Sequence, residues 1–574
     1  MRRRFVLFCV LLATALVGCG DGNGDGSDGA GGAGGARGLV VETRSGSVQG
    51  FDNDGVYSYR GIPYAAPPIG ELRWRPPSDL APWAGTLAVT EKPSICPQDA
   101  FAGLPVPGFM PDEDCLYLNV DTPAQGSALP VMVWIHGGGF TLGEGVQTDG
   151  GTAGDRIARA TGSVVVSMNY RLGQLGFLAH SDLSAESPEH SSGNYGLLDQ
   201  TAALKWVRDN IDVFGGDPDN VTIFGESAGA FSVCSHLASA KSAGLFARAI
   251  LQSGSCERPW PTLAAAEAQG DQFAEALGCN SEQDALACLR TKSAGEVLAA
   301  LPPGPNFGFN ASEEPSGTWG PVLDGAFFTE QPSDAFASGA FNRVPVIIGF
   351  TREEARLFTW LGEIVEPPLE VSSENYEALI ARLLGGDAEL ASRAVLEYPL
   401  DGYSEPAVAL AALATDTIFR CPGKREAAKM AAFTPTYLYQ FEYQDGHSQI
   451  EVALPFIGAD LPSYDLGAFH GADIPYVFGY DPVLEINFGD FSTTLNEWKP
   501  GTDDETLWLT ALGYFSRFAA TGEPSAPEGV QWPAYDPGAD QHLILDTTVS
   551  IGSNAADKCE FWEGEHYLAT ELRD

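Results

Sequence analysis

The chain has 574 residues, of which 32 are lysine or arginine and 76 are aspartate or glutamate, so its formal net charge is −44. This balance argues against nucleic acid as a partner, because proteins bind phosphates through basic patches. The 44% hydrophobic and 10% aromatic content predicts a globular protein with a sizeable core. We interpret the acidity as a solvated surface rather than as a device that steers cationic substrates.

The first 18 residues resemble a bacterial lipoprotein signal peptide. Three arginines precede an apolar run, residues 5–17, that is too short to span a bilayer as an ordinary transmembrane helix. The run ends in Leu16-Val17-Gly18-Cys19, which predicts cleavage before Cys19 and lipidation of that cysteine. The alternative is an ordinary cleaved signal with an incidental cysteine.

Residues 19–38 are rich in glycine and aspartate, which predicts a flexible tether ahead of one domain at residues 39–574. We therefore expect an exported protein that faces the periplasm or the cell exterior and contacts a membrane only through an N-terminal lipid anchor.

Apolar runs separated by helical stretches recur along the predicted domain. They predict an α/β fold, with a parallel sheet covered by helices on both faces. In such sheets, sites form beyond the carboxyl ends of the strands. The predicted strands are residues 131–135, 163–168, 221–224, 249–251 and 344–350, and residues 194–214 predict a helix.

The pentapeptide Gly225-Glu226-Ser227-Ala228-Gly229 follows one of these strands and precedes a small-residue helical stretch. That context is typical of a nucleophile elbow, in which a sharp turn lifts a serine hydroxyl out of the sheet. With 67 glycines in the chain, the pentapeptide alone is also compatible with an idle serine in a glycine-rich turn.

An oxyanion hole is the second requirement of acyl transfer, because negative charge develops on the carbonyl oxygen. His136-Gly137-Gly138-Gly139-Phe140 follows the predicted strand at residues 131–135. Glycines let backbone N–H groups approach a ligand closely. We predict that the N–H groups of Gly138, Gly139 and Ala228 form the hole.

The base should be a histidine that follows the serine in the chain. His236 falls within the helix after the elbow and is interpreted as a packing residue, whereas His447, His542 and His566 have no evident partner. His470 lies in a glycine-flanked loop and is the favoured candidate.

The acid should lie between Ser227 and His470, and Glu353 and Glu354 follow a predicted strand in that interval. Either carboxylate could orient the imidazole, and the spacing leaves both open.

Eight cysteines remain once Cys9 and Cys19 are set aside, and an even number in an exported protein favours disulfides. Sequential pairing is natural for Cys96 with Cys115 and for Cys279 with Cys288, although sequence alone does not fix the connectivity. The C-x-x-C spacing of a zinc site is absent from the sequence, and we predict no metal.

These motifs resemble the type-B carboxylesterase/lipase family, which includes cholinesterases and bacterial esterases. The resemblance runs from about residue 39 to 565. It rests on Gly61-Ile62-Pro63-Tyr64-Ala65 with Arg73-Trp74, on Glu113-Asp114-Cys115-Leu116-Tyr117-Leu118-Asn119-Val120, and on the stretch from Gly193 to Gly229.

The resemblance implies the α/β-hydrolase fold and resolves the open choices. Ser227 matches the nucleophile, His470 the base and Glu354 the acid. Positions that support the histidine loop are matched by Glu226, Ser253 and Asp473, the last of which is shorter than the usual glutamate. Trp260 and Phe358 fall where aromatic residues of the acyl pocket are found, although both are equally compatible with an ordinary core role.

The resemblance also implies three disulfides, Cys96–Cys115, Cys279–Cys288 and Cys421–Cys559. Cys234–Cys256 has no equally firm counterpart and is inferred from the even count and from the position of both cysteines near the elbow. The loop between Cys96 and Cys115 contains no tryptophan. Cholinesterases carry their aromatic platform for choline there, so its absence argues against a dedicated cholinesterase.

We therefore expect a serine hydrolase that cleaves small-molecule carboxylic esters through an acyl-enzyme, without a cofactor. One alternative is the same machinery acting on an amide, carbamate or lactone. The other is a cholinesterase-like binding protein without activity, which the complete set of matching residues disfavours.

Overall fold

The computed structural model describes residues 38–98, 111–146, 151–279, 284–302, 319–364, 368–444, 463–488, 491–496, 499–525, 528–553 and 558–563. The chain divides into two compact units, Met1–Ala36 and Arg37–Asp574. The predicted signal, Cys19 and nearly all of the predicted tether lie outside the described residues, which belong to the second unit. Within this described part, no helix is long and apolar enough to cross a membrane.

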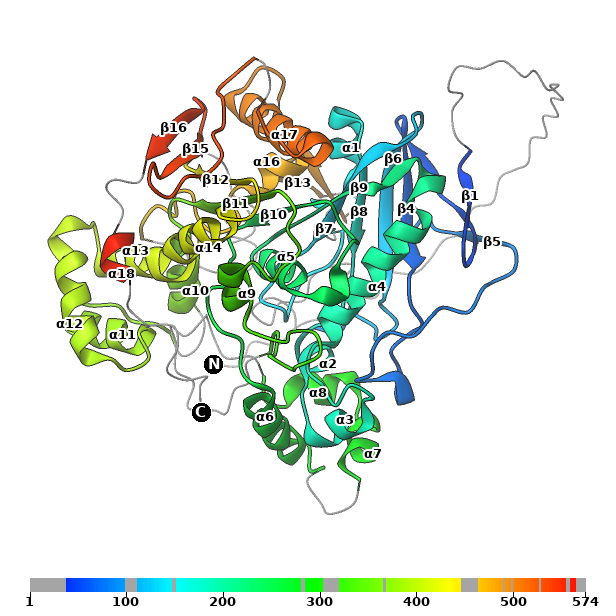
Figure 1. The fold of residues 1–574 in the computed structure, drawn as a ribbon, viewed down its shortest axis with the longest axis horizontal. Helices are drawn as coiled ribbons and strands as arrows, with labels where there is room; N and C mark the ends of the chain where they lie inside the picture. Colours follow the sequence, from blue (N-terminus) through cyan, green and yellow to red (C-terminus); the bar gives the residue numbers. More distant parts are fainter. Residues whose placement is uncertain are drawn as a thin grey trace. The chain divides into compact units, whose positions relative to one another are not determined.

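The second unit is built on a sheet of 11 strands in the order β16-β15-β12-β11-β10-β9-β7-β8-β6-β4-β3 (Figure 1). The strands from β8 to β15 in this order are parallel, and antiparallel pairs complete both edges. The strands are β3 (Phe51–Asn53), β4 (Val56–Pro63), β6 (Tyr117–Pro123), β7 (Leu129–Ile135), β8 (Val164–Met168), β9 (Gly216–Glu226), β10 (Arg248–Gln252), β11 (Val346–Thr351), β12 (Thr436–Phe441), β15 (Gln541–Leu545) and β16 (Ser550–Ser553).

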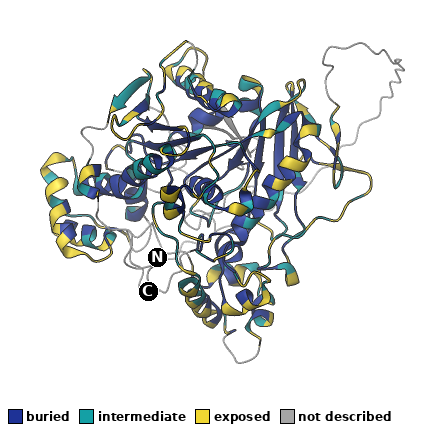
Figure 2. Ribbon diagram, viewed as in Figure 1, coloured by how far each residue is buried: buried dark blue, intermediate teal, exposed yellow. Residues whose placement is uncertain are grey.

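Helices cover both faces of this sheet because its strands are apolar on both sides. In β7, Val131, Val133 and Ile135 belong to one buried cluster, whereas Met132 and Trp134 belong to another. Helices α4 (Tyr195–Asn210) and α5 (Ala228–Ala238) pack on the first face. The second face is covered by α1 (Asp155–Thr161), α16 (Ile474–Phe478) and α17 (Asp503–Thr521). Figure 2 shows the central strands buried and the outer sides of the helices exposed.

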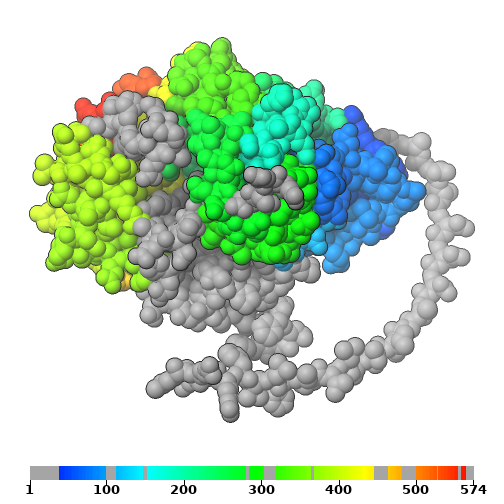
Figure 3. All heavy atoms as spheres, turned by 90° about the horizontal axis from the view of Figure 1, so that it is seen from below, coloured from blue at the N-terminus to red at the C-terminus, as the bar shows by residue number. Residues whose placement is uncertain are grey.

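The remaining elements surround this core. A third cluster joins α10 to α11, α12 and α13, and in Figure 3 the yellow-green surface of α11 and α12 lies at the opposite end from the blue N-terminal segment. These elements are α2 (Gly173–Phe177), α3 (Ser181–Glu186), α6 (Leu263–Ala276), α7 (Ala285–Arg290), α8 (Ala294–Ala299), α9 (Pro332–Ser338), α10 (Arg356–Ile364), α11 (Tyr376–Leu383), α12 (Ala388–Glu397), α13 (Pro406–Ala414), α14 (Cys421–Ala431), α18 (Cys559–Trp562), the small sheet of β1 (Val40–Thr43), β2 (Gly46–Gln49) and β5 (Thr86–Ala88), and the pair β13 (Asp481–Phe488) and β14 (Phe491–Asn496).

Element boundaries differ from the predictions where backbone geometry intervenes. The helix predicted over 194–214 ends at Asn210 and continues as a 3₁₀ turn over Ile211–Phe214. Gly215, with φ of 87°, then terminates it, since glycine adopts this left-handed conformation without steric cost. Between α13 and α14 the helix widens into a π-helical segment, Thr415–Arg420, which we call the π turn.

Four disulfides join Cys96 to Cys115, Cys234 to Cys256, Cys279 to Cys288, and Cys421 to Cys559. These are the four pairs that the sequence and the resemblance predict. Disulfides persist in oxidising compartments and are rare in the cytosol, so they indicate an extracellular or otherwise exported protein.

Candidate active site

Ser227 occupies a sharp turn between β9 and α5, with φ of 55° and ψ of −123°. The turn is possible because glycines flank it. A Cβ atom on Gly225 would lie 2.6 Å from the Ile135 carbonyl oxygen, and one on Gly229 would lie 2.0 Å from the same atom. Both glycines therefore let the elbow pack against the end of β7, and the strained serine is typical of a functional position.

Gly229→Ala is expected to lower the free energy of unfolding by about 3 kcal/mol or more, because its methyl group would overlap the Ile135 carbonyl. Urea denaturation followed by fluorescence measures the change. Gly513→Ala in α17 is the matched control, since a Cβ there meets no atom within 4 Å. That variant should gain about 0.5–1 kcal/mol from helix propensity, and equal losses in both variants would contradict the steric account.

His470 and Glu354 meet in the interior beside the elbow. His470 Nδ1 lies 2.7 Å from Glu354 Oε2, and the other carboxylate oxygen accepts the Thr351 N–H at 2.7 Å. Glu354 is fully buried and His470 is 7% exposed. The backbone N–H of His470 also donates to the Glu354 carbonyl oxygen at 3.2 Å. One side-chain bond and one backbone bond thus join His470 to Glu354, and among the described residues the buried Nε2 has no hydrogen-bond partner.

Glu353 points elsewhere. Its Oε2 accepts the N–H of Ala468 at 3.0 Å, and its backbone N–H donates to the Ala468 carbonyl at 2.9 Å. Arg352 Nε lies 2.7 Å from the other carboxylate oxygen of Glu353. The adjacent carboxylates therefore face in different directions, and only Glu354 of the two contacts the imidazole ring.

Further carboxylates surround the imidazole. Glu226 Oε1 lies 3.2 Å from His470 Nε2. Asp473 accepts hydrogen bonds from Gln252 at 2.9 Å and from the Tyr439 hydroxyl at 2.8 Å. Asp473 is thus held by β10 and β12 beneath the histidine loop, and Glu226 by the end of β9.

These charges set the protonation of the site. Burial raises the pKa of Glu226 to about 8, although His470 opposes the rise. Burial lowers the pKa of His470, but Glu226 and Glu354 outweigh it and raise that pKa to about 9. Burial also raises the pKa of Asp473, against the two hydrogen bonds that it accepts. The carboxylates around His470 therefore stabilise the positive charge that its imidazole carries when it is protonated.

The glycine loop after β7 turns back on itself. Gly138, Gly139 and Phe140 have φ of 103°, 63° and 61°, and the Gly138 carbonyl accepts the N–H groups of Thr141 and Leu142. A Cβ atom on Gly137 would lie 3.2 Å from that of Ser227, so the loop passes directly over the elbow.

Ala228 begins α5, where backbone N–H groups have no intrahelical acceptor. The predicted amides thus belong to two segments that meet at the serine. His136 anchors the loop, because its ring stacks on Tyr170 at 4.3 Å.

The other predicted residues lie around this centre. Ser253, with φ of 55°, is fully buried beside β11, and its hydroxyl finds no hydrogen-bond partner within the described part of the chain. Phe358 packs on the His470 ring at 4.8 Å. Trp260 is half-buried and its ring lies 6.2 Å from that of Phe231, in the helix after the elbow.

The structure also shows what the competing histidines do. His236 is fully buried and bonded to Ser242 and Gln200, so its packing role is confirmed. His542 lies in β15, whereas His447 and His566 fall outside the described residues.

Sequence reasoning missed several residues of the site. Phe419 of the π turn packs on His470 at 4.9 Å and stacks on Phe358. Gln252 and Tyr439 hold Asp473. Gln252 could have been noticed as a polar residue at the end of an apolar strand. Phe419 carries no such signal, because its position depends on the π turn.

Comparisons with known proteins agree with this geometry. The profile of the Carboxylesterase family matches residues 37–562. A para-nitrobenzyl esterase of Bacillus subtilis is 36% identical over 525 residues, which cover 89% of this chain and 96% of that protein. A fumonisin B1 esterase of Sphingopyxis macrogoltabida is 37% identical over 508 residues, covering 87% and 85% of the two chains.

An acylcarnitine hydrolase of Mus musculus is 34% identical over 558 residues, covering 91% of this chain and 90% of the other. A solved structure of a PNB esterase superposes with a TM-score of 0.71 at 35% identity, over 90% of this chain and 98% of the other. The sheet and its helices are thus an α/β-hydrolase fold. The chain therefore belongs to the carboxylesterase family and is a serine hydrolase that cleaves carboxylic esters.

Proposed function

We propose that Ser227 is the nucleophile, His470 the general base and Glu354 the acid that orients it. Ser227 Oγ attacks the ester carbonyl while His470 Nε2 takes its proton and then gives it to the departing alcohol. Water activated by the same nitrogen then attacks the acyl-enzyme, and the carboxylic acid leaves. Glu354 holds Nδ1 throughout and stabilises the imidazolium.

The amides of Gly138, Gly139 and Ala228 are proposed to hold the oxyanion, because they come from a positive-φ glycine loop and from a helix start beside Ser227. Glu226, Ser253 and Asp473 are proposed to support the histidine loop. The observation that carries the assignment is the 2.7 Å contact between His470 Nδ1 and the fully buried Glu354.

The test is hydrolysis of a nitrophenyl-ester series of increasing acyl length by the wild type and by Ser227→Ala. Wild-type turnover that the variant lacks at every length supports the assignment, and equal turnover would overturn it. The series also shows which acyl groups the enzyme accepts, for which Trp260 and Phe358 are the proposed pocket residues.

Glu226→Gln is expected to move the acidic limb of the kcat/KM profile to lower pH. His470 must be neutral to accept the serine proton, so activity rises as pH passes its pKa. Glu226 raises that pKa, and removing its charge lowers it. Glu267→Gln, which alters a carboxylate bonded to Ser184 in another part of the fold, should leave the limb unchanged. A shift to higher pH in Glu226→Gln would contradict the electrostatic account.

The N-terminus is proposed to be a lipoprotein signal, cleaved before Cys19, followed by a flexible tether at residues 19–38. Support comes from the sequence of the signal and from the disulfides, which indicate export. Metabolic labelling with a palmitate analogue in a bacterial host should mark the wild type and not Cys19→Ala. Label on both proteins, or on neither, would contradict the anchor.

A further inference from the structure

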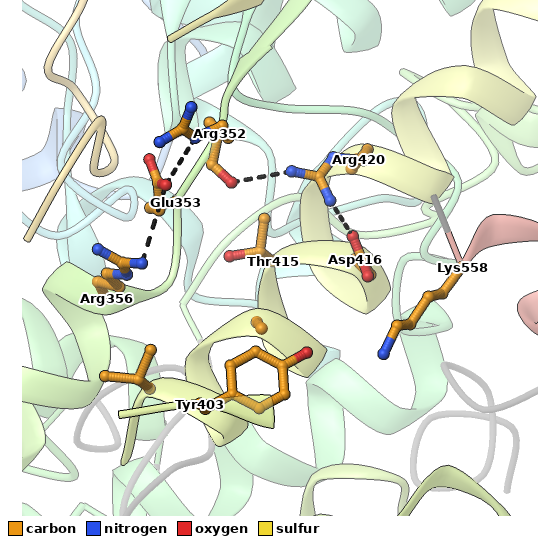
Figure 4. Close-up of a pocket in the computed structure, with 10 residues that line it drawn as sticks. Arg352, Glu353, Arg356, Tyr403, Thr415, Asp416, Arg420 and Lys558 are labelled. Atoms are coloured by element: carbon orange, nitrogen blue, oxygen red, sulfur yellow. Dashed lines mark hydrogen bonds and ion pairs between the residues drawn. The ribbon is translucent and has the colours of Figure 1, made fainter. Parts of the chain in front are cut away.

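A cavity of about 280 Å³ lies beside the turn that contains Arg352, Glu353 and Arg356 (Figure 4). Its walls come from the start of α10, from α13, from the π turn and from the residue before α18. We call it the basic cavity. It is lined by Arg352, Glu353, Arg356, Tyr403, Val408, Ala412, Thr415, Asp416, Arg420 and Lys558.

The charge of this lining is opposite to that of the whole chain. Four cationic residues face two carboxylates, in a protein with 32 basic and 76 acidic residues. Charges farther away than about 8 Å are largely screened at physiological salt, so the potential inside depends on the lining and on the neighbouring Glu442, which lies 3.5 Å from Arg352. The basic cavity is therefore a place where this acidic protein attracts an anion.

Both lining carboxylates are already engaged. Glu353 lies 2.7 Å from Arg352 and 3.8 Å from Arg356. Asp416 accepts the Tyr398 hydroxyl at 2.7 Å and pairs with Arg420. Arg352 also lies 3.5 Å from Glu442, outside the lining. Three carboxylates thus pair with the three arginines, and the ammonium group of Lys558 adds a fourth positive charge.

Donor capacity is also left over. Arg420 Nε is buried and has no hydrogen-bond partner among the described residues, whereas Lys558 Nζ donates to the Glu397 carbonyl. Leaving a buried guanidinium N–H unsatisfied costs free energy that a bound anion would recover. Val408 and Ala412 add apolar surface to the lining, and the ring of Tyr403 also faces the cavity (Figure 4).

We propose that the basic cavity binds a small carboxylate with a short apolar chain, and that its binding slows ester hydrolysis. The volume equals roughly nine water molecules at about 30 Å³ each, which suits a medium-chain carboxylate. The guanidinium and ammonium groups match its head, and the apolar wall matches its chain. The acid released by an esterase has this chemistry, so the cavity provides product feedback. This regulatory part rests on the proposed roles of Glu354 and His470.

Anion binding in the basic cavity is coupled to the loop that carries His470 through two walls of the cavity. Glu353 holds the histidine loop through both of its bonds to Ala468, and Arg352 and Arg356 hold Glu353. On the opposite wall, Thr415 Oγ1 accepts the N–H of Ala355 at 3.0 Å, next to Glu354. An anion that draws the arginines away from Glu353 loosens the loop that carries the base. It should lower kcat and leave KM nearly unchanged.

Octanoate is the probe, and its binding to the full-length enzyme is measured by calorimetric titration. Ser227 is phosphonylated beforehand, because the phosphonyl group keeps octanoate out of the active site. We expect one saturable site per chain. Arg356→Gln and Lys558→Gln should each weaken binding at least tenfold, and Ala412→Phe should abolish it by filling the space while keeping every charge. Arg208→Gln, an exposed arginine bonded to Gly244, is the control and should bind like the wild type.

In steady-state assays octanoate should lower the wild-type kcat, and it should lose this effect in Ala412→Phe. Absence of binding to the phosphonylated enzyme, binding that Ala412→Phe retains, or tighter binding of inorganic phosphate than of octanoate would overturn the proposed ligand. Binding without a change in kcat would overturn the feedback. If Ser227 resists phosphonylation, the proposed function fails instead, and titration of the untreated protein still tests the cavity.

Discussion

Ser227→Ala is expected to lower kcat for a nitrophenyl ester by roughly 10⁴- to 10⁶-fold, the range seen when a nucleophile of this type is removed. The elbow itself should survive. The Ser227 backbone N–H donates to the Gln252 carbonyl at 2.9 Å, and its carbonyl accepts from Phe231, and neither bond needs the hydroxyl. Substrate binding should therefore persist while the covalent step is lost.

Ser235→Ala is the matched control for this variant. Its hydroxyl is buried in α5, the helix that follows Ser227, and donates to the Phe231 carbonyl at 2.6 Å. Turnover within about twofold of the wild type is expected there, because a single buried hydrogen bond contributes only about 1 kcal/mol to stability. A fluorophosphonate should modify the peptide that contains Ser227, and modification of a different serine would overturn the assignment even if Ser227→Ala were inactive.

Glu354→Gln is expected to lower kcat by roughly 10³- to 10⁴-fold, the effect of replacing a triad acid by its amide. The amide oxygen can still accept the Thr351 N–H, but an N–H₂ group would then face His470 Nδ1. That donor favours the tautomer whose proton sits on Nε2, which cannot take the serine proton. It also removes the charge that stabilises the imidazolium.

Glu353→Gln provides the comparison in the same turn. Its side chain braces Ala468 and pairs with Arg352, so a loss of only about tenfold is expected, through a looser histidine loop. Steady-state kinetics on both variants show which carboxylate is the acid, and circular dichroism verifies that both variants fold. A larger loss of kcat in Glu353→Gln than in Glu354→Gln would show that Glu353, and not Glu354, is the acid.

Local patterns predicted the parts of this molecule that depend on neighbours in the chain. The parallel strands and the elbow follow from apolar runs and glycine spacing, and the structure places them as expected. Spacing left Glu353 and Glu354 as equally good candidates for the acid, because both follow the same strand. Their side chains diverge only when the loop containing Ala468 and His470 packs against that strand, and the resemblance to a family supplied what spacing could not.

Other features could not be predicted from local patterns. The π turn that brings Phe419 to His470 depends on one extra residue per helical turn, which composition does not encode. The basic cavity brings together residues from the start of α10, the π turn and the residue before α18. No single charged residue among them indicates a binding site in the sequence. Such sites follow from tertiary packing, which sequence periodicity does not describe.

The disulfide between Cys421 and Cys559 spans 138 residues, and His470 lies inside that span. It has a consequence for biogenesis. When such a chain is exported, Ser227 emerges early, whereas His470, the proposed base, and Cys559 follow only near the end of translocation. Contacts between such distant segments form late in folding. We therefore expect esterase activity to appear only after synthesis and oxidation are complete, so that no active hydrolase meets the esters of the cytoplasm on its way out.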